Sequence, residues 1–263
     1  VIHFAGLKAV SESVSKPLLY WENNVVGSFN LLRSMEEYNC KNIVFSSSAT
    51  VYKSKLNKLL NENDYCEPVN PYGQTKLSVE KLLDNLYQSA PSDWRIACLR
   101  YFNPVGAHES GLIGEDPLGK PNNLFPLITR VAIGKLEKIE IFGSDWPTPD
   151  GTGIRDYIHV MDLAEGHFAA LSYLIKNNPG IITLNLGTGL GTSVLELIKT
   201  FKEVNNVLVP FSFENRRPGD NAFVVADTSL AKSMLNWKPK RNIDEICRDG
   251  WNWQLKNPNG FKD

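Results

Sequence analysis

The sequence predicts an α/β fold whose first part is a Rossmann-like, doubly wound parallel sheet. Two short apolar runs, Asn42–Phe45 and Arg95–Phe102, have the length and composition of buried parallel strands. A helical repeat of apolar residues separates them and begins at Pro71, because proline is well tolerated in the first turn of a helix. Strands that alternate with helices at this spacing favour a parallel sheet covered by helices.

Composition limits the classes of protein to consider. The chain has 263 residues, 42% of them hydrophobic, and a formal net charge of −1, which allows a sizeable core and gives no support for nucleic-acid or membrane-surface binding. No apolar run approaches the roughly 18 residues that span a bilayer. The cysteines and histidines lack the spacing of disulfide frameworks or metal sites, so we expect reduced thiols, no metal and a cytoplasmic protein.

A long helical segment precedes the first of these strands. Residues 11–39 carry apolar side chains at helical spacing, and we expect Pro17 and Gly27 to bend or split the helix. Asn23 lies in the middle of this pattern, where asparagine is a poor helix former. From the residues alone Asn23 is either a solvated amide or a ligand contact.

The residues with candidate chemistry follow the strand Asn42–Phe45. Three serines, Ser46–Ser48, stand at its carboxyl end, which is where ligands bind in open α/β sheets. Tyr72 and Lys76 come next, four residues apart on one face at the start of a helix. An ammonium group beside a phenol lowers the phenol pKa, so Tyr72 could serve as a general base. The pattern alone is equally compatible with a surface tyrosine and lysine.

This Ser–Tyr–Lys set resembles that of the extended short-chain dehydrogenase/reductase family that acts on nucleotide sugars, and within it the UDP-glucose 4-epimerases. Further matching motifs run almost from end to end of the chain: Phe4–Lys8, Ser46–Tyr52, Tyr72–Lys76, Arg100–Gly106, Pro121–Leu124, Asp150–Val160 and Arg216–Asp220. The resemblance implies NAD as cofactor and UDP-glucose and UDP-galactose as substrates. We also expect a homodimer.

The resemblance implies a role for each matching residue. The catalytic residues would be Ser48, Tyr72 and Lys76. The cofactor contacts would be Phe4, Ala5, Gly6, Leu7, Lys8, Asn23, Ser48, Tyr72, Lys76 and Phe102. The substrate contacts would be Ser48, Tyr72, Asn103, Asn123, Leu124, Arg155, Arg217, Asp220 and Val224, with the arginines on the diphosphate and Val224 facing C2 of the sugar.

We expect such a sheet to lack its N-terminal part in this sequence. The chain opens on Val1–Phe4, which has the pattern of a strand interior. A Gly-rich phosphate loop after a first strand and an acidic residue after a second are both absent. We therefore expect the Rossmann sheet to be incomplete by roughly two βαβ units.

Beyond Asn103–Pro104 glycine and proline become dense and the elements shorter. We expect helices near residues 124–133, 161–175 and 192–204, and strands at 139–142, 156–159 and 181–186. We divide the chain into residues 1–103, a partial NAD-binding domain with the catalytic residues, and residues 104–263, a smaller α/β domain that binds the UDP-sugar.

One glycine motif imitates a dinucleotide loop. Gly187–Gly191 has three alternating glycines between a strand and a helix, but no acidic partner about 20 residues on. Ser193 and Glu196 have the spacing of a capping box, which explains the helix start without a ligand. We therefore predict a structural turn.

Two other functions compete with epimerisation. A sugar-nucleotide dehydratase or decarboxylase of the same family is disfavoured, because a dehydratase needs acidic residues beside the strand-end hydroxyl and none occurs from Ser46 to Asn61. An inactive fragment is the other alternative, because the cofactor loop is missing. Retention of NAD by the chain would separate this alternative from an active enzyme.

Overall fold

The computed structural model describes residues 1–53, 57–117, 119, 121, 123–177, 180–217 and 219–261. Within these residues the main sheet has four parallel strands, ordered β1 (Ile2–His3), β2 (Asn42–Ser48), β3 (Arg95–Tyr101) and β8 (Ile181–Leu186). The predicted α/β class with a parallel, Rossmann-like sheet is confirmed.

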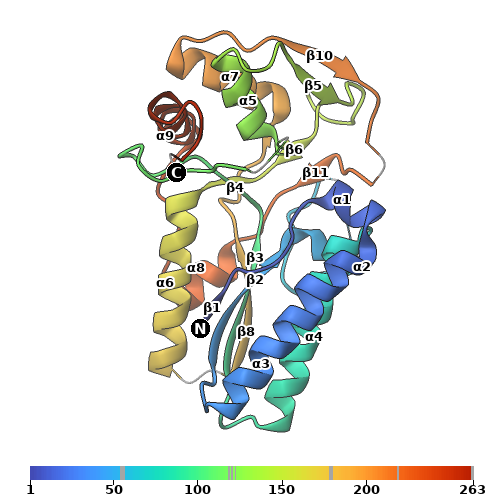
Figure 1. Ribbon diagram of the computed structural model, residues 1–263, viewed down its shortest axis with the longest axis vertical. Helices are drawn as coiled ribbons and strands as arrows, with labels where there is room; N and C mark the ends of the chain where they lie inside the picture. Colours follow the sequence, from blue (N-terminus) through green and yellow to red (C-terminus); the bar gives the residue numbers. More distant parts are fainter. Residues whose placement is uncertain are drawn as a thin grey trace.

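Helices cover both faces of this sheet, which is why its central strands are continuously apolar. Helices α3 (Gly27–Glu37) and α4 (Pro71–Ser89) lie on one face, and α6 (Val160–Asn177) and α8 (Ser229–Leu235) lie on the other (Figure 1). Alternate residues of β2 serve the two cores: Ile43 and Phe45 pack with Leu83 of α4, while Val44 packs in the cluster of Leu174 of α6.

The predicted split of the 11–39 segment is present at Pro17, whereas at Gly27 the backbone stays helical and only changes from π to α. The segment forms α1 (Val10–Ser15), α2 (Pro17–Tyr20), a π-helical turn over Trp21–Val26, and α3. Pro17 occupies the first position of α2, where its missing N–H has no helical partner in any case. The π-helical turn widens the helix around Asn23 and Asn24, and such turns are frequent at functional sites.

A second group of elements lies beyond the carboxyl ends of the sheet strands (Figure 1). Its helices are α5 (Leu124–Ala132), α7 (Val194–Asn205) and α9 (Ile243–Lys256), which share a core around Ile128, Phe201 and Ile246. Its strands are short and pair in small sheets: β4 (Asn103–Val105) with β7 (Tyr157–His159), β5 (Ile139–Phe142) with β10 (Phe211–Glu214), and β6 (Ile154–Arg155) between β9 (Thr192–Ser193) and β11 (Phe223–Val224).

The chain passes between the two groups more than once. Strand β8 and helices α6 and α8 follow residue 104, yet they complete the first sheet and its covering layer. That residues 1–103 bind NAD and residues 104–263 bind the UDP-sugar stays a prediction. The topology adds that residues 160–177, 181–186 and 229–235 belong with the first sheet.

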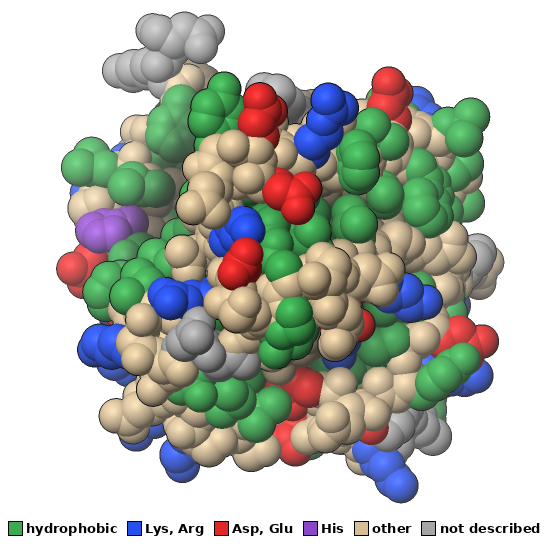
Figure 2. All heavy atoms as spheres, turned by 90° about the horizontal axis from the view of Figure 1, so that it is seen from below, with side chains coloured by type: hydrophobic (Ala, Val, Ile, Leu, Met, Phe, Trp, Pro, Cys, Tyr) green, Lys and Arg blue, Asp and Glu red, His purple; other side chains and the backbone are tan. Residues whose placement is uncertain are grey.

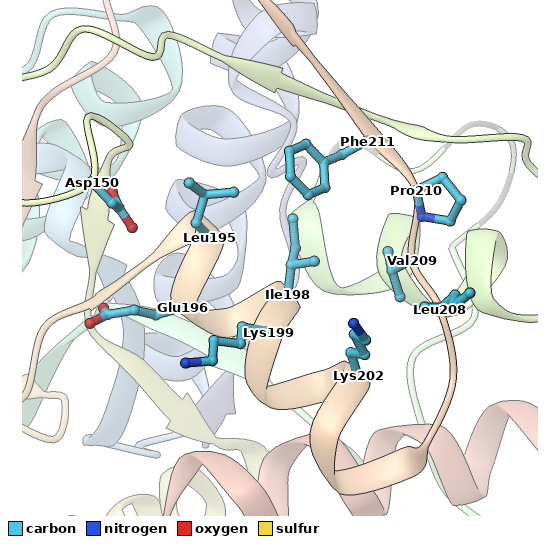
Figure 3. A pocket seen from close by; sticks show the side chains of 10 residues that line it. All are labelled: Asp150, Leu195, Glu196, Ile198, Lys199, Lys202, Leu208, Val209, Pro210 and Phe211. Carbon is cyan, nitrogen blue, oxygen red and sulfur yellow. The ribbon is translucent and has the colours of Figure 1, made fainter.

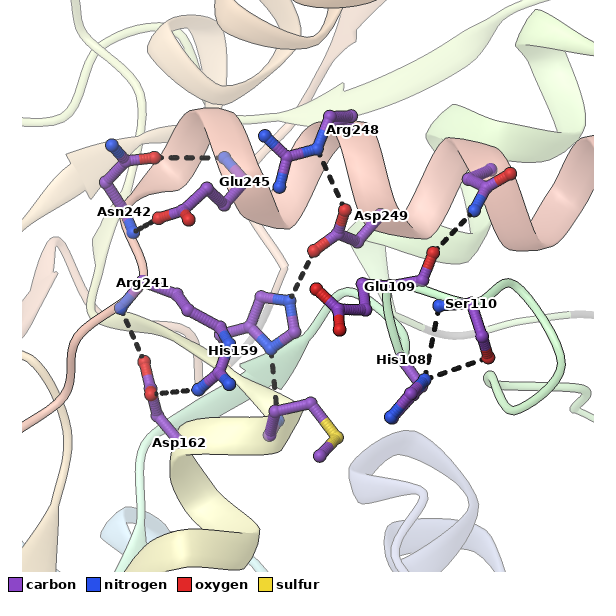
Figure 4. A network of polar contacts seen from close by, with 12 residues as sticks. His108, Glu109, Ser110, His159, Asp162, Arg241, Asn242, Glu245, Arg248 and Asp249 are labelled. Atoms are coloured by element: carbon purple, nitrogen blue, oxygen red, sulfur yellow. Dashed lines mark hydrogen bonds and ion pairs between the residues drawn. The ribbon is translucent and has the colours of Figure 1, made fainter.

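A buried polar network joins the groups where α6 begins (Figure 4). The N–H of Met161 donates to His159 Nδ1 at 3.0 Å, so the ring proton is on Nε2, which lies 3.3 Å from Asp249 on α9. Burial lowers the pKa of His159, which favours this neutral form. Arg241 donates to Asp162 at 2.6 Å and fixes the following turn of α6.

The molecular surface is of mixed character. Seen from below, basic and acidic side chains are interspersed with hydrophobic ones (Figure 2). None of the helices in the described ranges is both long enough and apolar enough to span a bilayer.

Candidate active site

Ser48 is held at the carboxyl end of β2 by a cap. It precedes a 3₁₀ turn over Ala49–Val51, and its Oγ accepts hydrogen bonds from the N–H of Thr50 at 3.2 Å and from Thr50 Oγ1 at 3.0 Å. Because both of these contacts use the lone pairs of Ser48 Oγ, its own proton is left to donate elsewhere. The side chain is almost fully buried.

The start of α4 approaches Ser48 closely because residue 73 is glycine. Asn70 caps the helix by accepting from the N–H of Gly73 at 2.9 Å, and Pro71 takes the first position. A Cβ at Gly73 would lie 2.5 Å from the carbonyl oxygen of Thr50, which no real side chain allows. The helix therefore rests directly on the turn that follows Ser48, and it brings the Tyr72 hydroxyl near enough to Ser48 for the serine to lower the pKa of Tyr72.

Lys76 lies one helical turn further on and is buried. Its Nζ donates to the carbonyl oxygen of Ser46 at 2.7 Å, and lies 5.0 Å from the ring centroid of Phe45 and 5.9 Å from that of Tyr72. Among the described residues, Ser46 is the one hydrogen-bond acceptor for this ammonium group. Since a lysine has three N–H donors, two remain for a ligand at this position.

The ionisation of Tyr72 differs from the sequence prediction. We expected Lys76 to lower the Tyr72 pKa, but burial raises the pKa of Tyr72, and the Ser48 hydrogen bond opposes this rise. Burial also lowers the pKa of Lys76 to about 8, because a low-dielectric site disfavours its charge. Without a ligand, Tyr72 is therefore a neutral phenol, and the ammonium group of Lys76 loses its proton more readily than that of an exposed lysine.

The Lys76 pKa predicts a pH-dependent stability. Folding lowers this pKa from 10.5 to about 8, so between these values the unfolded chain binds more protons than the folded chain. The free energy of unfolding therefore rises with pH across this window, by at most about 1.4 kcal/mol per pH unit, and the contribution is constant below pH 8. Urea unfolding of wild type and Lys76→Met at pH 7.5 and 9.5 should show wild type gaining on the variant at the higher pH. An identical difference at both pH values would contradict the assignment.

The Phe4–Lys8 loop lies over Lys76. A Cβ at Gly6 would meet Asn24 Oδ1 at 3.0 Å and Lys76 Nζ at 3.8 Å, so glycine allows the close approach. Phe4 is 58% exposed, and its ring lies tilted against His167 at 4.9 Å between ring centroids. Ala5 is exposed, and Lys8 pairs with Glu115 at 3.1 Å. The loop thus presents backbone and an exposed ring beside the buried ammonium.

The side chain of Asn23 forms no hydrogen bond to this loop, all of which the structure describes. It is exposed and donates to the carbonyl oxygen of Leu19 at 2.9 Å. Its neighbour Asn24 is the residue that bonds to the loop, and the sequence did not single it out. A cofactor contact by Asn23 stays a prediction.

Several predicted substrate residues lie around the end of β3. Phe102 is buried next to Tyr101, and the N–H of Asn103 donates to the carbonyl oxygen of Asp156 at 2.9 Å. Arg155 and Val224 are register partners on β6 and β11. Val224 packs against the cluster that contains Phe102. The two parts of the chain therefore meet at these residues.

Of the remaining predicted substrate residues, two form an ion pair and three lie apart from it. Arg155 and Asp220 form an ion pair at 2.5 Å. Arg217 is exposed and stacks on the Phe142 ring at 3.7 Å, while Asn123 is exposed before α5 and Leu124 packs on the α5 core. Asn122 and Pro218 of the matching motifs lie outside the described residues.

Comparison with known proteins identifies the family. The family model described as GDP-mannose 4,6 dehydratase matches residues 1–250. A UDP-glucose 4-epimerase of Bacillus subtilis is 55% identical over all of this chain and 77% of its own length. The chain belongs to the UDP-glucose 4-epimerase family, within the extended short-chain dehydrogenases/reductases.

Solved structures of this family have the same fold. The UDP-glucose 4-epimerase of Stenotrophomonas maltophila, crystallised with NAD and formylated UDP-arabinopyranose, has a TM-score of 0.95 at 50% identity, covering 98% of this chain and 76% of its own. The Bifidobacterium longum enzyme, crystallised with NAD+ and UDP, has a TM-score of 0.94 at 50% identity, covering 99% and 77%.

In this epimerase-family chain a carboxylate of the protein itself binds the N–H groups of the Gly187–Gly191 loop. Asp156 accepts from the N–H groups of Thr188 at 2.7 Å, Gly189 at 2.9 Å and Ala226 at 3.2 Å. Burial raises the pKa of Asp156, and these hydrogen bonds oppose the rise. The predicted capping box of Ser193 and Glu196 is present. The loop is a structural turn, because the chain's own carboxyl group takes its N–H donors.

A buried ion pair behind Ser48 was also missed by the sequence analysis. Arg100 Nε and Nη2 donate to the two oxygens of Glu80 at 3.0 and 2.7 Å, and Ser47 Oγ donates to the same carboxylate. Glu80 stands one helical turn after Lys76 on α4, and Ser47 precedes Ser48. The pair therefore ties β2, β3 and α4 together immediately behind the site.

An apolar cavity lies away from these residues. It has a volume of about 490 Å³ and is formed between α7 and the segment leading into β10, where Leu195, Ile198 and Phe211 converge (Figure 3). The concave surface is lined by the second group of elements and contains no residue of the Ser48–Tyr72–Lys76 set. We assign the chemistry to the strand ends because the polar groups converge there.

Proposed function

We propose that this protein interconverts UDP-glucose and UDP-galactose with NAD, by transient oxidation at C4 of the sugar. The observation that carries the proposal is the gathering of Ser48, Tyr72 and the partly unsatisfied Lys76 at the carboxyl end of β2. The C4–H bond of a hexose is not acidic, so a base alone cannot invert this centre. Oxidation to a ketone and reduction on the opposite face avoids that difficulty.

The residues present fit NAD at this position. The two N–H donors of Lys76 without a partner among the described residues suit ribose hydroxyls, and Gly6 lets backbone approach from above. When bound, NAD supplies the hydride acceptor for C4 and returns the hydride to the ketone. Lys76 and the Phe4–Lys8 loop would hold the cofactor, with Asn23 and Phe102 as further predicted contacts.

The chain's own residues handle the proton. Tyr72 acts as a phenolate, a form that the positive charges of Lys76 and of bound NAD would favour against the effect of burial. The phenolate takes the proton of O4 as the ketone forms and returns it to O4 after the sugar has turned. Ser48 donates its free proton toward Tyr72 or O4 and so orients the acceptor. Arg155 and Arg217 would bind the diphosphate, Asp220 a ribose hydroxyl, and Asn103, Asn123 and Leu124 would line the remaining substrate path.

The direct test follows a label at C4. UDP-glucose carrying deuterium at C4 should yield UDP-galactose that keeps the deuterium in normal water, because the same hydride returns to the sugar. Loss of the label to solvent would contradict transient oxidation by a bound cofactor. A product lighter by one water would indicate a dehydratase, which is not favoured because Ser46–Asn61 contains no acidic residue.

The small size of Val224 predicts that the protein accepts more than one kind of UDP-sugar. The residue is half-buried against the Phe102 cluster, and valine leaves more space than a tyrosine would. We expect the protein to accept UDP-N-acetylhexosamines as well, and Val224→Tyr to reduce their kcat/KM by roughly tenfold or more relative to UDP-glucose. The measurement is kcat/KM for both sugars, with Val224→Ala as the control that keeps the space open. An unchanged ratio in Val224→Tyr would show that Val224 is strand packing alone.

The homodimer and the cytoplasmic location stay predictions. Apolar side chains that are half-exposed or more gather on the segment from α1 to α3, namely Val14, Leu18, Val26 and Phe29. They would suit a second copy of the chain.

A further inference from the structure

The Arg216 side chain joins the segment after β10 to the turn after β5. Its Nε donates to Asp145 Oδ1 at 2.7 Å, and its Nη2 donates to the carbonyl oxygen of Asp145 at 2.5 Å. The guanidinium also lies over the Trp146 ring, 4.0 Å from its centroid. One side chain therefore binds a carboxylate, a backbone carbonyl and an aromatic face, all within a single turn.

A glycine allows this turn to pack closely against Arg216. A Cβ at Gly143 would lie 2.4 Å from Trp146 Nε1 and 3.0 Å from Arg216 Cγ, so a larger residue would displace both side chains. The N–H of Gly143 donates to the carbonyl oxygen of Glu214 at 2.8 Å, which continues the pairing of β5 with β10 (Figure 1). The contact made by Arg216 therefore extends a connection that the two strands begin.

The two joined segments carry the two arginines that we assign to the diphosphate. The turn after β5 leads to Arg155 in β6, and Arg217 directly follows Arg216. A second tie joins the same segments, because Arg155 pairs with Asp220. In sequence, Arg217 therefore lies between the two ties, and its guanidinium stacks on the Phe142 ring.

The two adjacent arginines differ in what they can offer a ligand. Arg216 already uses Nε and Nη2 on Asp145. Within the described ranges the Arg217 side chain donates no hydrogen bond to the protein, so its N–H donors are free to bind phosphate oxygens. This difference separates a residue that holds the segment from a residue that binds the ligand.

We propose that Arg216 is a positioning residue that fixes the segment bearing Arg217 against the turn after β5, so that Arg217 and Arg155 together bind one diphosphate. This inference rests on the proposed function, in which these two arginines bind the diphosphate of the UDP-sugar. Arg216 itself touches no substrate. It acts through Asp145 and Trp146 by ordering the Arg217 backbone before the ligand arrives, which lowers the entropy lost on binding.

The experiment compares Arg216→Gln, Arg216→Lys, Asp145→Ala and the double variant Arg216→Gln with Asp145→Ala in the full-length protein. Arg248→Gln is the matched control, since Arg248 Nε also donates to a carboxylate, of Asp249 at 3.0 Å, and lies on α9. The readouts are the dissociation constant of UDP by calorimetry, kcat and KM for UDP-glucose, and amide hydrogen exchange at Gly143. Salt at about 0.15 M screens the changes in net charge, and thermal unfolding measures the general loss of stability.

We expect Arg216→Gln to raise the dissociation constant of UDP and the KM for UDP-glucose by roughly five- to tenfold, the scale of a charge-assisted contact that also stacks on an aromatic ring, while kcat changes little. Arg216→Lys keeps the charge but loses the planar fork, so it should bind UDP as weakly as Arg216→Gln. Asp145→Ala should weaken UDP binding by about threefold, because the backbone contact remains. The double variant should lose little more than Arg216→Gln alone, since both changes break one contact. Exchange at Gly143 should be faster in each of these variants and unchanged in Arg248→Gln.

Any of four outcomes would overturn the inference. An unchanged dissociation constant of UDP in Arg216→Gln would make the contact purely structural. Unchanged or tighter UDP binding in Asp145→Ala, with weaker binding in Arg216→Gln, would make Arg216 a direct phosphate ligand. Wild-type affinity in Arg216→Lys would reduce the role of Arg216 to its charge, and an equal loss in Arg248→Gln would make it an effect of stability.

Failure of the proposed function would be seen separately. A wild-type protein that binds UDP but does not epimerise UDP-glucose would contradict the proposed function. The UDP affinities and the exchange at Gly143 would still decide the role of Arg216, because neither readout depends on turnover.

Discussion

Tyr72→Phe is expected to lower kcat for the interconversion of UDP-glucose and UDP-galactose by a factor of about 10² to 10⁴, the usual contribution of a general acid–base group. The substitution removes the hydroxyl whose pKa Ser48 lowers and leaves the ring beside Lys76 in place. KM should change far less than kcat, because the lost interaction develops mainly in the transition state.

A second tyrosine on the same helix serves as the control. Tyr87 lies near the end of α4, packed against the core of the sheet rather than at the strand ends. Tyr87→Phe should leave kcat unchanged, and melting temperatures should show both variants folded. A Tyr72→Phe enzyme with wild-type turnover would remove Tyr72 from the acid–base role.

Arg100→Met is expected to lower the free energy of unfolding by about 3–5 kcal/mol, because it leaves the carboxylate of Glu80 buried without its partner. Both side chains are less than 9% exposed, and the contact uses two parallel hydrogen bonds. Burial acts to lower the pKa of Arg100, but its hydrogen bonds and ion pair with Glu80 outweigh this effect and raise the pKa above its ordinary value. The guanidinium is therefore charged throughout the accessible pH range. Urea unfolding at pH 7 measures the loss.

The double variant separates pairing from packing. Glu80→Leu combined with Arg100→Met removes both charges, so its stability loss should be smaller than the sum of the two single losses. The exposed pair of Lys53 and Glu67 is the control, and Lys53→Met should have no measurable effect. Strict additivity at Glu80 and Arg100 would show that the two charges do not stabilise one another.

Local patterns were sufficient for most elements of the fold. The strand at residues 139–142 and the start of the helix at Pro71 were predicted to the residue, because apolar period and proline position are local signals. The short strands β4, β6, β9 and β10 were not predicted. Each has two to four residues and is defined by a partner far along the chain, as when Phe211 pairs with Ile139.

The candidate site was predictable where a motif carries the chemistry. Ser48, Tyr72 and Lys76 are found together as expected, but the direction of the Tyr72 pKa was wrong because burial cannot be read from spacing. Asn24 was missed in favour of Asn23, since a π-helical turn changes which of two adjacent residues faces inward. The only signal for Asn24 in the sequence was that it is an asparagine next to Asn23.

While a ribosome synthesises this chain, β3 emerges long before its outer neighbour. Arg100 of β3 pairs with Asn185 of β8, and the roughly 85 residues between them take on the order of 4–17 s to translate. Throughout that interval β3 is an open edge of the nascent sheet, and the face that α6 will cover is bare around Val44, Ala97 and Leu99. Nascent chains halted between residues 104 and 180 should therefore bind holdase chaperones, and release should coincide with the appearance of β8.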